Sequence, residues 1–461
     1  MSESAATRPE TIWSARHAWV TAGSVALIFL AALQSLAVTT VMPVVSADLG
    51  GAALYAVAFS GTLATSVIGM VVVGAWSDRT GPVAPLTAAV ALFVVGLVIA
   101  GLAPTMPVLV AGRLVQGLGT GGQVVALYVV TARVYPPSLH GRVFAAFSAA
   151  WVVPSLIGPF LAGAVAEFLH WRWVFLGVAV LTAAAFAMVA LRLRGIPLRT
   201  DHPATGPIGI RMLCAVLVAI GGVTTSLAGE FPVPAWLVVL VSLIVIVLAL
   251  RPLLPKRTLV AARGLPSVVL MRGFIAGALF GAEIYVPYLL IERDGFPPTL
   301  AGLGLTAAAI AWAVAADISG RVGDRLGNAR ISVLGAAQLF TAAVVVGAAA
   351  LLHLHPIVVI VGWAFAGGGM GLMYPRLTVL TLAYSTSRDQ GFNSSALSIF
   401  DAIGSTVVIA VMGLVFTALA GGPAAFPAVF GIAAALAVAA LVPGLRLGHA
   451  RETGQARAPI V

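Results

Sequence analysis

Two acidic residues lie deep inside apolar stretches of the 461-residue sequence, and they are the strongest candidates for chemistry. Glu283 and Asp401 each stand about eight residues, or about 12 Å of helix, from the nearer end of an apolar run. A charged carboxylate is expensive at that depth in a membrane, so its presence suggests reversible proton binding. The alternative is a structural hydrogen bond or ion pair.

One arginine is a candidate for the same chemistry. Arg113 lies within an apolar run, where a cation needs a partner or water unless its side chain reaches the membrane surface. The predicted site for proton coupling and substrate consists of Glu283, Asp401, Arg113, Gln34, Trp151 and Tyr285. Arg272 and Arg376 lie only about two helical turns from the end of a run, so simple snorkelling to the surface is enough to explain them.

The other polar residues show no pattern typical of an enzyme. Cys214 is the only cysteine, which excludes an internal disulfide and a cysteine metal cluster. The sequence has no Walker A motif, no Gly-x-Ser-x-Gly element and no zinc-ligand spacing, and His353 and His355 are expected to border an outer loop. We therefore expect no enzyme activity, no cofactor and no metal site.

The composition of the chain indicates the kind of structure that holds these residues in place. Hydrophobic residues make up 61% of the chain and charged residues only 9%, against about 25% charged in an ordinary soluble domain. This excludes a water-soluble enzyme and predicts an all-α polytopic membrane protein. The net charge of +10 comes from basic residues in short loops rather than from a Lys/Arg tract, so nucleic acid is not an expected partner.

Fourteen apolar segments are long enough, at about 20 residues each, to be candidate membrane spans. The first follows the polar residues 1–17 and is longer than a signal-peptide core, so we expect it to remain as a helix. The predicted spans are 18–43, 52–75, 84–103, 107–131, 143–166, 173–193, 207–228, 233–250, 265–291, 298–319, 331–352, 356–383, 393–419 and 424–444.

The placement of arginines predicts the orientation of the spans. With the N-terminus in the cytoplasm, most basic residues fall in inner loops and tails, and the outer loops hold only Arg172 and Arg293. Both termini are then cytoplasmic, and the composition suggests the plasma membrane of a bacterium. The expected partners are the bilayer, a small-molecule substrate and protons, and the expected state is a monomer.

A weak internal repeat divides the chain. The loop Gly74-Ala-Trp-Ser-Asp78-Arg79-Thr-Gly81 recurs as Gly320-Arg-Val-Gly-Asp324-Arg325-Leu-Gly327, so that residue 78 corresponds to residue 324. Two six-helix halves alone would need an offset of about 200 residues, and the surplus matches the seventh and eighth spans. The predicted divisions are a tail 1–17, a first half 18–195, an insert 196–262, a second half 263–445 and a tail 446–461.

This repeated Gly-x-x-x-Asp-Arg-x-Gly loop resembles the signature of the major facilitator superfamily. Fourteen spans, two of them between the halves, are similar to its drug/proton antiporter branch. The resemblance implies a cytoplasmic gate formed by Gly74, Asp78, Arg79, Gly81, Gly320, Asp324, Arg325 and Gly327. The first loop departs from the family pattern at Pro82 and Val83, where basic residues are usual, and a tight turn that requires glycine is the structural alternative.

Two more segments resemble motifs of this family. Arg113 matches an arginine associated with proton transfer. The segment 154–163 is similar to the antiporter motif, although Pro154 and Ala162 replace glycines; its predicted functional residues are Pro154, Gly158, Pro159 and Gly163. Because that motif is more typical of exporters than of importers, it gives the predicted direction. An ordinary kinked helix is the alternative.

The sequence thus predicts a proton-coupled exporter, an antiporter, of small amphipathic compounds, with multidrug efflux as its activity. Two halves would rock about a central cavity. Two alternatives stay open: a proton-coupled importer of a polar nutrient, and a lipid-handling transporter or accessory factor. The few amides inside the spans, Gln34, Gln116 and Gln123, count against the importer.

Overall fold

The computed structural model describes residues 11–14, 17–193, 209–385 and 390–447, and within these ranges the chain is helical and contains no strand. Helices suit an apolar surrounding because each one satisfies its own backbone hydrogen bonds. Twelve helices are long and apolar enough to cross a membrane in the described part of the chain. The all-α membrane fold expected from composition is confirmed.

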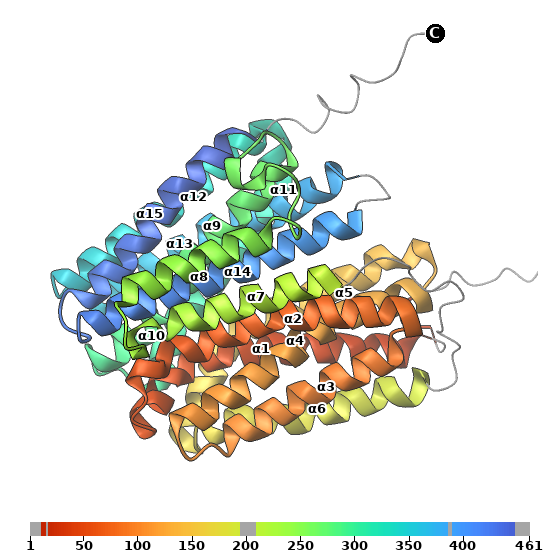
Figure 1. Cartoon of the computed structure of the whole chain (residues 1–461), viewed down its shortest axis with the longest axis horizontal. Helices are drawn as coiled ribbons and strands as arrows, with labels where there is room; N and C mark the ends of the chain where they lie inside the picture. Colours follow the sequence, from red (N-terminus) through yellow and green to blue (C-terminus); the bar gives the residue numbers. More distant parts are fainter. Residues whose placement is uncertain (1–10, 15–16, 194–208, 386–389, 448–461) are drawn as a thin grey trace, which may run out of the picture.

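Six helices form the first half, drawn from red to yellow in Figure 1. In this half α1 packs on α5 and α6, whereas α4 packs on α2 and α3. The helices are α1 (Ala18–Asp48), α2 (Tyr55–Thr80), α3 (Val83–Gly101), α4 (Met106–Val134), α5 (Pro137–Phe168) and α6 (Arg172–Leu193).

The second half repeats this pattern of packing. Here α9 packs on α14 and α15, whereas α13 packs on α11 and α12. Its helices are α9 (Leu265–Glu283), α10 (Tyr285–Glu292), α11 (Pro298–Leu326), α12 (Asn328–Leu351), α13 (Pro356–Ala383), α14 (Gln390–Ala418) and α15 (Ala425–Leu445).

Glycines mark the internal repeat in atomic detail. Gly81 and Gly327, which end the two repeated loops, have φ angles of 94° and 83°, a conformation that side chains disfavour. A Cβ on Gly117 would collide with the backbone of Thr62, and one on Gly367 would collide in the same way with Ala308. These glycines let α4 approach α2, and α13 approach α11, as closely as small residues permit.

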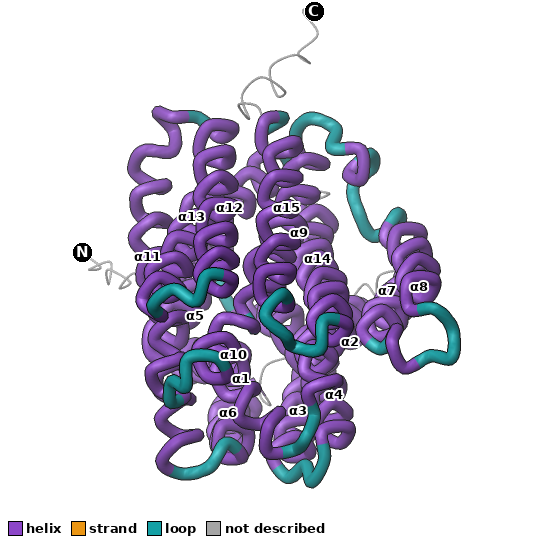
Figure 2. The backbone as a smooth tube through the Cα atoms, turned by 90° about the vertical axis from the view of Figure 1, so that its left-hand side faces the viewer, coloured by secondary structure: helices purple, strands orange, loops and turns teal. Residues whose placement is uncertain are grey.

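The two helices between the halves are shorter than predicted. α7 (Gly209–Ser226) and α8 (Ala235–Leu250) have 18 and 16 residues, whereas the spans expected from sequence were 207–228 and 233–250. α7 packs on α2 of the first half and on α14 of the second, and α8 packs on α7. Figure 2 shows this pair at one side of the molecule. The insert therefore lies beside the seam between the halves.

The ninth predicted span, 265–291, is confirmed as one membrane-length apolar stretch, Leu265–Glu292, whose helical hydrogen-bond pattern is interrupted once. This break in the hydrogen-bond pattern lies at Ile284, between α9 and α10, where the backbone angles remain helical, with φ −64° and ψ −24°. Pro287 lacks the backbone N–H that would bond to the carbonyl of residue 283, so the helical ladder is interrupted directly after Glu283. The break places an acidic residue at the end of a helix in the middle of an apolar span.

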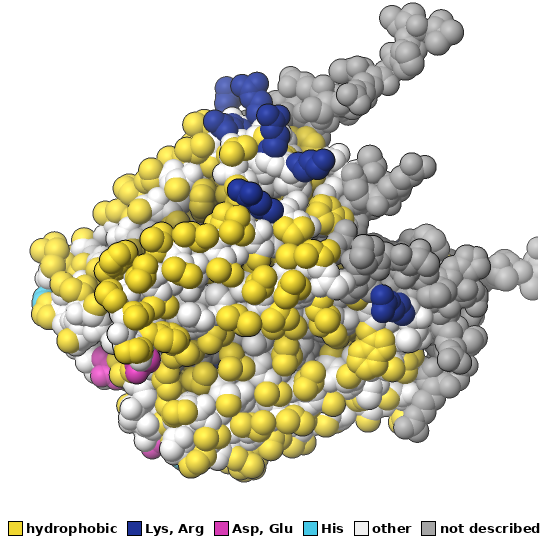
Figure 3. Space-filling model, viewed as in Figure 1, with side chains coloured by type: hydrophobic (Ala, Val, Ile, Leu, Met, Phe, Trp, Pro, Cys, Tyr) yellow, Lys and Arg dark blue, Asp and Glu magenta, His cyan; other side chains and the backbone are white. Residues whose placement is uncertain are grey.

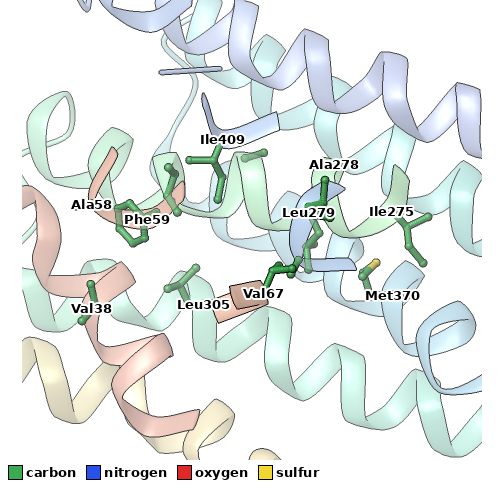
Figure 4. Packing of buried hydrophobic residues seen from close by; sticks show 14 of the residues in the cluster. Val38, Ala58, Phe59, Val67, Ile275, Ala278, Leu279, Leu305, Met370 and Ile409 are labelled. Carbon is green, nitrogen blue, oxygen red and sulfur yellow. The ribbon is translucent and has the colours of Figure 1, made fainter. Parts of the chain in front are cut away.

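Apolar side chains fill the centre of the molecule, where the halves meet (Figure 4). Val38 and Val67 come from the first half, and Leu279, Leu305 and Ile409 come from the second; all five are buried. Contacts of α5 with α11 and of α2 with α14 join the halves. The interface between them is thus built from helix surfaces that are apolar in the middle.

The two ends of the helix bundle differ in charge (Figure 3). We call the end where α1 begins and α15 ends the basic end, because most exposed arginines lie there. The opposite, acidic end carries Asp48, Glu167, Glu230, Glu292 and Asp294.

Candidate functional site

A buried ion pair joins three helices of the second half. Arg272 on α9 donates from Nε to Oδ1 of Asp401 on α14, at 2.7 Å. The hydroxyl of Tyr374 on α13 donates to the other carboxylate oxygen of Asp401, at 3.2 Å. Arg272 also donates through Nη1 to the backbone carbonyl of Tyr374 and to the hydroxyl of Thr378. We call Arg272, Asp401, Tyr374 and Thr378 the charge cluster.

The two charged side chains of the charge cluster differ in exposure. The Arg272 side chain is only 9% exposed, but the Asp401 side chain is 20% exposed. Aromatic rings border the cluster, since Trp312 and Phe280 both contact the ring of Tyr374 edge-on. An ion pair with one accessible partner and an aromatic wall can receive a proton or an amphipathic cation in competition with the arginine.

Snorkelling, the simple explanation considered for Arg272 and Arg376, is wrong for Arg272. Arg272 turns inward to the charge cluster because a guanidinium gains more from a carboxylate and two neutral acceptors than from a strained reach to the surface. Arg376 donates from Nε to the amide oxygen of Asn328, at 2.6 Å, and so ties α13 to α12. Arg272 is therefore part of the protein interior, whereas half-buried Arg376 reaches the beginning of α12 at the basic end, as snorkelling would also place it.

Glu283 lies apart from the charge cluster, at the break between α9 and α10. Its side chain is half-buried, and it makes no hydrogen bond or ion pair to any residue that the structure describes. Glu283 and Arg272 are on the same helix, about 16 Å apart along its axis. The two acids predicted to act together therefore stand at different depths.

Aromatic residues surround the break near the acidic end. The hydroxyl of Tyr55 on α2 donates to the backbone carbonyl of Ile284, at 2.6 Å. The ring of Tyr55 stacks on Tyr288, and Tyr285 packs against Phe416. Tyr285, a predicted substrate residue, is buried in this aromatic cluster rather than in the charge cluster.

The predicted residues of the first half do not join either cluster through a hydrogen bond that the structure shows. Arg113 is buried, and it donates to the backbone carbonyl of Ala58 and to the side chain of Gln116. Its partners are thus neutral groups of the first half. Gln34 is fully buried and its amide has no partner among the described residues, whereas Trp151 is 46% exposed.

The predicted gate loops are only partly described. The side chains of Asp78 and Asp324 lie outside the described part of the structure. Arg79 and Arg325 are exposed at the basic end, next to the turns at Gly81 and Gly327, and Gly74 and Gly320 lie on the helices before those turns. The turns fit the tight-turn interpretation of these glycines, and the gate stays a prediction.

The predicted antiporter motif lies on α5, where the halves touch. A Cβ on Gly163 would lie 2.6 Å from the carbonyl oxygen of Pro298, and one on Gly302 would lie 2.6 Å from that of Pro159. Close by, the hydroxyl of Thr299 donates to the carboxylate of Glu167. Gly158 faces α1 at Leu33, and Pro154 is buried. The motif thus allows α5 and α11 to meet tightly near the acidic end.

Several residues of the site were missed from sequence. Tyr374 and Thr378 gave no signal, because tyrosine and threonine are ordinary in membrane helices. A signal for the pair of Arg272 with Asp401 did exist: the two charges are opposite and lie at similar depth from the same end of the bundle. Charges inside a membrane usually pair with one another. No group of three or more metal-binding side chains occurs among the described residues.

The family model that describes the Major Facilitator Superfamily matches residues 25–270 and again 268–459. The chain belongs to this superfamily. The two matches meet near the beginning of α9, in keeping with the repeated packing of the two halves.

Relatives within the superfamily include proteins named for drug transport. The chain is 28% identical over 430 residues to a probable multidrug-efflux transporter of Mycobacterium tuberculosis, with 88% of each chain covered. It is 26% identical to the multidrug transporter protein MdtP of Bacillus subtilis, covering 87% of this chain and 75% of that one. An uncharacterized transporter of M. tuberculosis is 28% identical, but this chain spans only 61% of its length.

Solved structures of the superfamily share the fold. A POT family transporter in complex with 5-aminolevulinic acid aligns with a TM-score of 0.68 at 15% identity, covering 92% of this chain and 95% of that one. A D-xylose–proton symporter aligns with a TM-score of 0.64, also at 15% identity, covering 95% and 98%. At this identity the likeness concerns the fold alone.

Proposed function

We propose that this superfamily member is a proton-coupled exporter of small amphipathic compounds, in which protons enter as substrate leaves. The observation that carries the proposal is the charge cluster. Asp401 is held by Arg272 and Tyr374, yet part of its side chain is accessible beside the rings of Trp312 and Phe280. Relatives named as multidrug transporters support the same class of substrate.

Exchange follows from competition for one carboxylate. In the resting state Arg272 neutralises Asp401 at 2.7 Å. An amphipathic cation that stacks on Tyr374 or Trp312 competes with the guanidinium for Asp401, whereas a proton on Asp401 removes the attraction for both. Substrate and proton therefore exclude each other at this residue. Such exclusion is the requirement for antiport.

Glu283 supplies a second place for a proton. Its carboxylate lies where α9 ends, beside the break and next to the residue whose carbonyl accepts the Tyr55 hydrogen bond. A carboxylate without a partner in an apolar span is costly, so protonation lowers the cost of holding it there. We assign Glu283 to proton coupling and Arg113 to the support of the first half.

Orientation and direction belong to the same proposal. The basic end is placed in the cytoplasm, because arginine-rich loops are retained on that side. The contacts of Tyr55 with Ile284 and of Glu167 with Thr299 close the acidic, outer end. Closed outside and with Asp401 partly accessible, the arrangement supports an inward-facing state that is ready to receive substrate from the cytoplasm.

The test is transport of a cationic dye and of protons in the same proteoliposomes. An imposed proton gradient is expected to drive dye movement, and dye added without a gradient is expected to move protons. Asp401→Asn tests the charge cluster. Asp317→Asn serves as its matched control, because Asp317 pairs with Arg321 on an exposed surface, with 59% of its side chain accessible. Dye transport that ignores the proton gradient would refute coupling, and gradient-driven uptake of a sugar without dye transport would favour the importer.

A further inference from the structure

The segment that joins α8 to α9, residues 251–264, is short and strongly basic. It contains Arg251, Lys256, Arg257 and Arg263 and no acidic residue, and all four cationic side chains are exposed. None of them makes an ion pair with a residue in the described part of the chain. In Figure 3, Lys and Arg side chains gather over this segment and the end of α15. We call residues 251–264 the basic loop.

Hydrogen bonds and buried side chains hold the basic loop in a defined shape. The hydroxyl of Thr258 donates to the carbonyl of Pro255 at 2.7 Å, and that of Ser267 donates to the carbonyl of Ala262 at 2.8 Å. Arg446, at the end of α15, donates to the carbonyl of Ala261 at 2.7 Å. Leu253, within the basic loop, is buried. The exposed cations therefore project from an ordered platform.

The backbone of the basic loop is strained at a charged residue. Arg257 and Ala261 have φ angles of 67° and 50°, and they are two of the four non-glycine residues with positive φ in the described ranges. Glycine would adopt this conformation at lower cost. The two left-handed residues bend the backbone at both ends of the short helical turn Thr258–Val260 and so help to define the shape of the loop.

Apolar surface adjoins the cations directly. Ile244, Val247 and Leu248 on α8 are 40–53% exposed, and α8 ends one residue before Arg251. Within the loop itself Val260 is 66% exposed. An apolar helix face that leads to a rim of unpaired cations matches a molecule with an anionic head and long hydrocarbon chains.

We propose that the basic loop binds the headgroup of an anionic phospholipid, whose acyl chains lie along the exposed face of α8. Phosphate is the ligand that several lysines and arginines recognise together. The tail of the chain itself is a poor alternative occupant, because residues 448–461 contain Arg451 and Arg457 against one acid, Glu452. This inference goes beyond the proposed function and depends on neither the substrate nor the proton.

The experiment uses the full chain, purified in detergent and titrated with short-chain phosphatidylglycerol. Hydrogen exchange of the backbone amides in 251–264 and the melting temperature report binding. Lys256→Gln with Arg257→Gln is expected to weaken the apparent affinity about fivefold for each cation removed. The matched control is Arg142→Gln with Arg330→Gln, which removes the same charge from exposed positions at the same end and is expected to keep the wild-type affinity.

Three results would overturn the proposal. Equal protection of 251–264 by phosphatidylcholine would make the interaction non-specific for charge. Equal protection by inorganic phosphate would make the loop a site for free anions rather than for lipid. An equal loss of affinity in the control variant would show that lipid binding depends on the general positive charge of this end and not on the basic loop. If the first variant does not fold, Arg251→Gln with Arg263→Gln tests the same platform from its two ends.

Discussion

At the scale of single residues, Asp401 and Arg272 show why charges are tolerated inside this molecule. Each neutralises the other at 2.7 Å, and Tyr374 and the hydroxyl of Thr378 supply further hydrogen bonds to the pair. Burying either charge alone would cost several kcal/mol, whereas the pair with its neutral partners is close to balanced. The 20% exposure of Asp401 then leaves one group of the pair open to exchange.

Removing the carboxylate is expected to cost stability as well as activity. Asp401→Asn leaves the Arg272 guanidinium buried without an anion, so we expect the free energy of unfolding to fall by about 3 kcal/mol. The melting temperature in detergent measures this loss. Adding Arg272→Gln is expected to restore much of it, since no charge is then left unpaired. A single Asp401→Asn variant as stable as wild type would show that the pair is fully solvated; Asp317→Asn, in an exposed pair, is the control.

Glu283 has no such partner, and its substitution is expected to act differently. Glu283→Gln keeps the shape of the side chain and loses only titration, so we expect loss of proton-driven efflux with substrate binding retained. Substrate-induced proton movement in proteoliposomes measures the first, and dye-binding fluorescence the second. Glu292→Gln, at the exposed end of α10, is the matched control. Full coupling in the double variant Glu283→Gln, Asp401→Asn would remove both acids from the mechanism.

At the scale of elements, the break between α9 and α10 links the acid to the contact between the halves. Tyr55 donates to the carbonyl of Ile284, the residue next to Glu283, and stacks on Tyr288. Rearrangement of the break when Glu283 gains or loses a proton would thus be felt directly by α2 of the other half. The interruption of hydrogen bonding after Glu283, rather than a long chain of contacts, would connect proton binding at Glu283 with the contact between the halves.

Tyr55→Phe is expected to loosen the contacts between the halves at the acidic end. The substitution keeps the ring and removes one hydrogen bond of 2.6 Å, worth about 1 kcal/mol, so the outward-open population should rise about fivefold. Labelling of a cysteine at the acidic end, in a Cys214→Ser background, measures that population. Tyr288→Phe is the control, because its hydroxyl makes no hydrogen bond within the described residues. Equal labelling of the two variants would argue against a role of the Tyr55–Ile284 hydrogen bond in closing this end.

The elements also show what sequence could and could not supply. The turns at Gly81 and Gly327 were predictable because glycine adopts a positive φ at lower cost than other residues. For Arg272 and Asp401 the opposite charges at similar depth made a pair conceivable, but the contact itself was not predictable, because the residues are 129 positions apart and meet only through the rotation of α9 and α14 about their axes. Likewise Pro287 was visible in the sequence, but its break was not, since prolines such as Pro43 and Pro159 lie within unbroken helices.

At the scale of the whole molecule, the insert decides the topology. Ideal helices of 18 and 16 residues are about 27 and 24 Å long, short of a hydrocarbon layer of about 30 Å. Local thinning of the bilayer accommodates such a mismatch at modest cost, so we expect both helices to span. Reporter fusions after residues 200 and 260 should then report the cytoplasm, and a fusion after residue 230 the outside. All three on one side would make α7 and α8 a surface hairpin.

Alternating access requires that the halves separate at the acidic end, and the described contacts show where a covalent bridge should prevent it. Glu167 on α5 accepts a hydrogen bond from Thr299 on α11, next to the tight approach of Gly163 to Pro298. Cysteines at positions 167 and 299, joined by a short reducible thiol cross-linker, are expected to stop transport completely. The only native cysteine, Cys214, is buried and is replaced by serine to keep the reaction specific.

Reduction of the bridge is expected to restore transport to the level before cross-linking, because the halves are then free to part again. Each single cysteine variant treated with the same reagent controls for blocking by the reagent itself. Dye efflux in proteoliposomes is the measurement, taken before bridging, after bridging and after reduction. Efflux that continues with the bridge intact would mean that α5 and α11 stay together throughout the cycle. The outer end would then have to open elsewhere, at the contact of α2 with α10, and the two halves could not rock as rigid bodies.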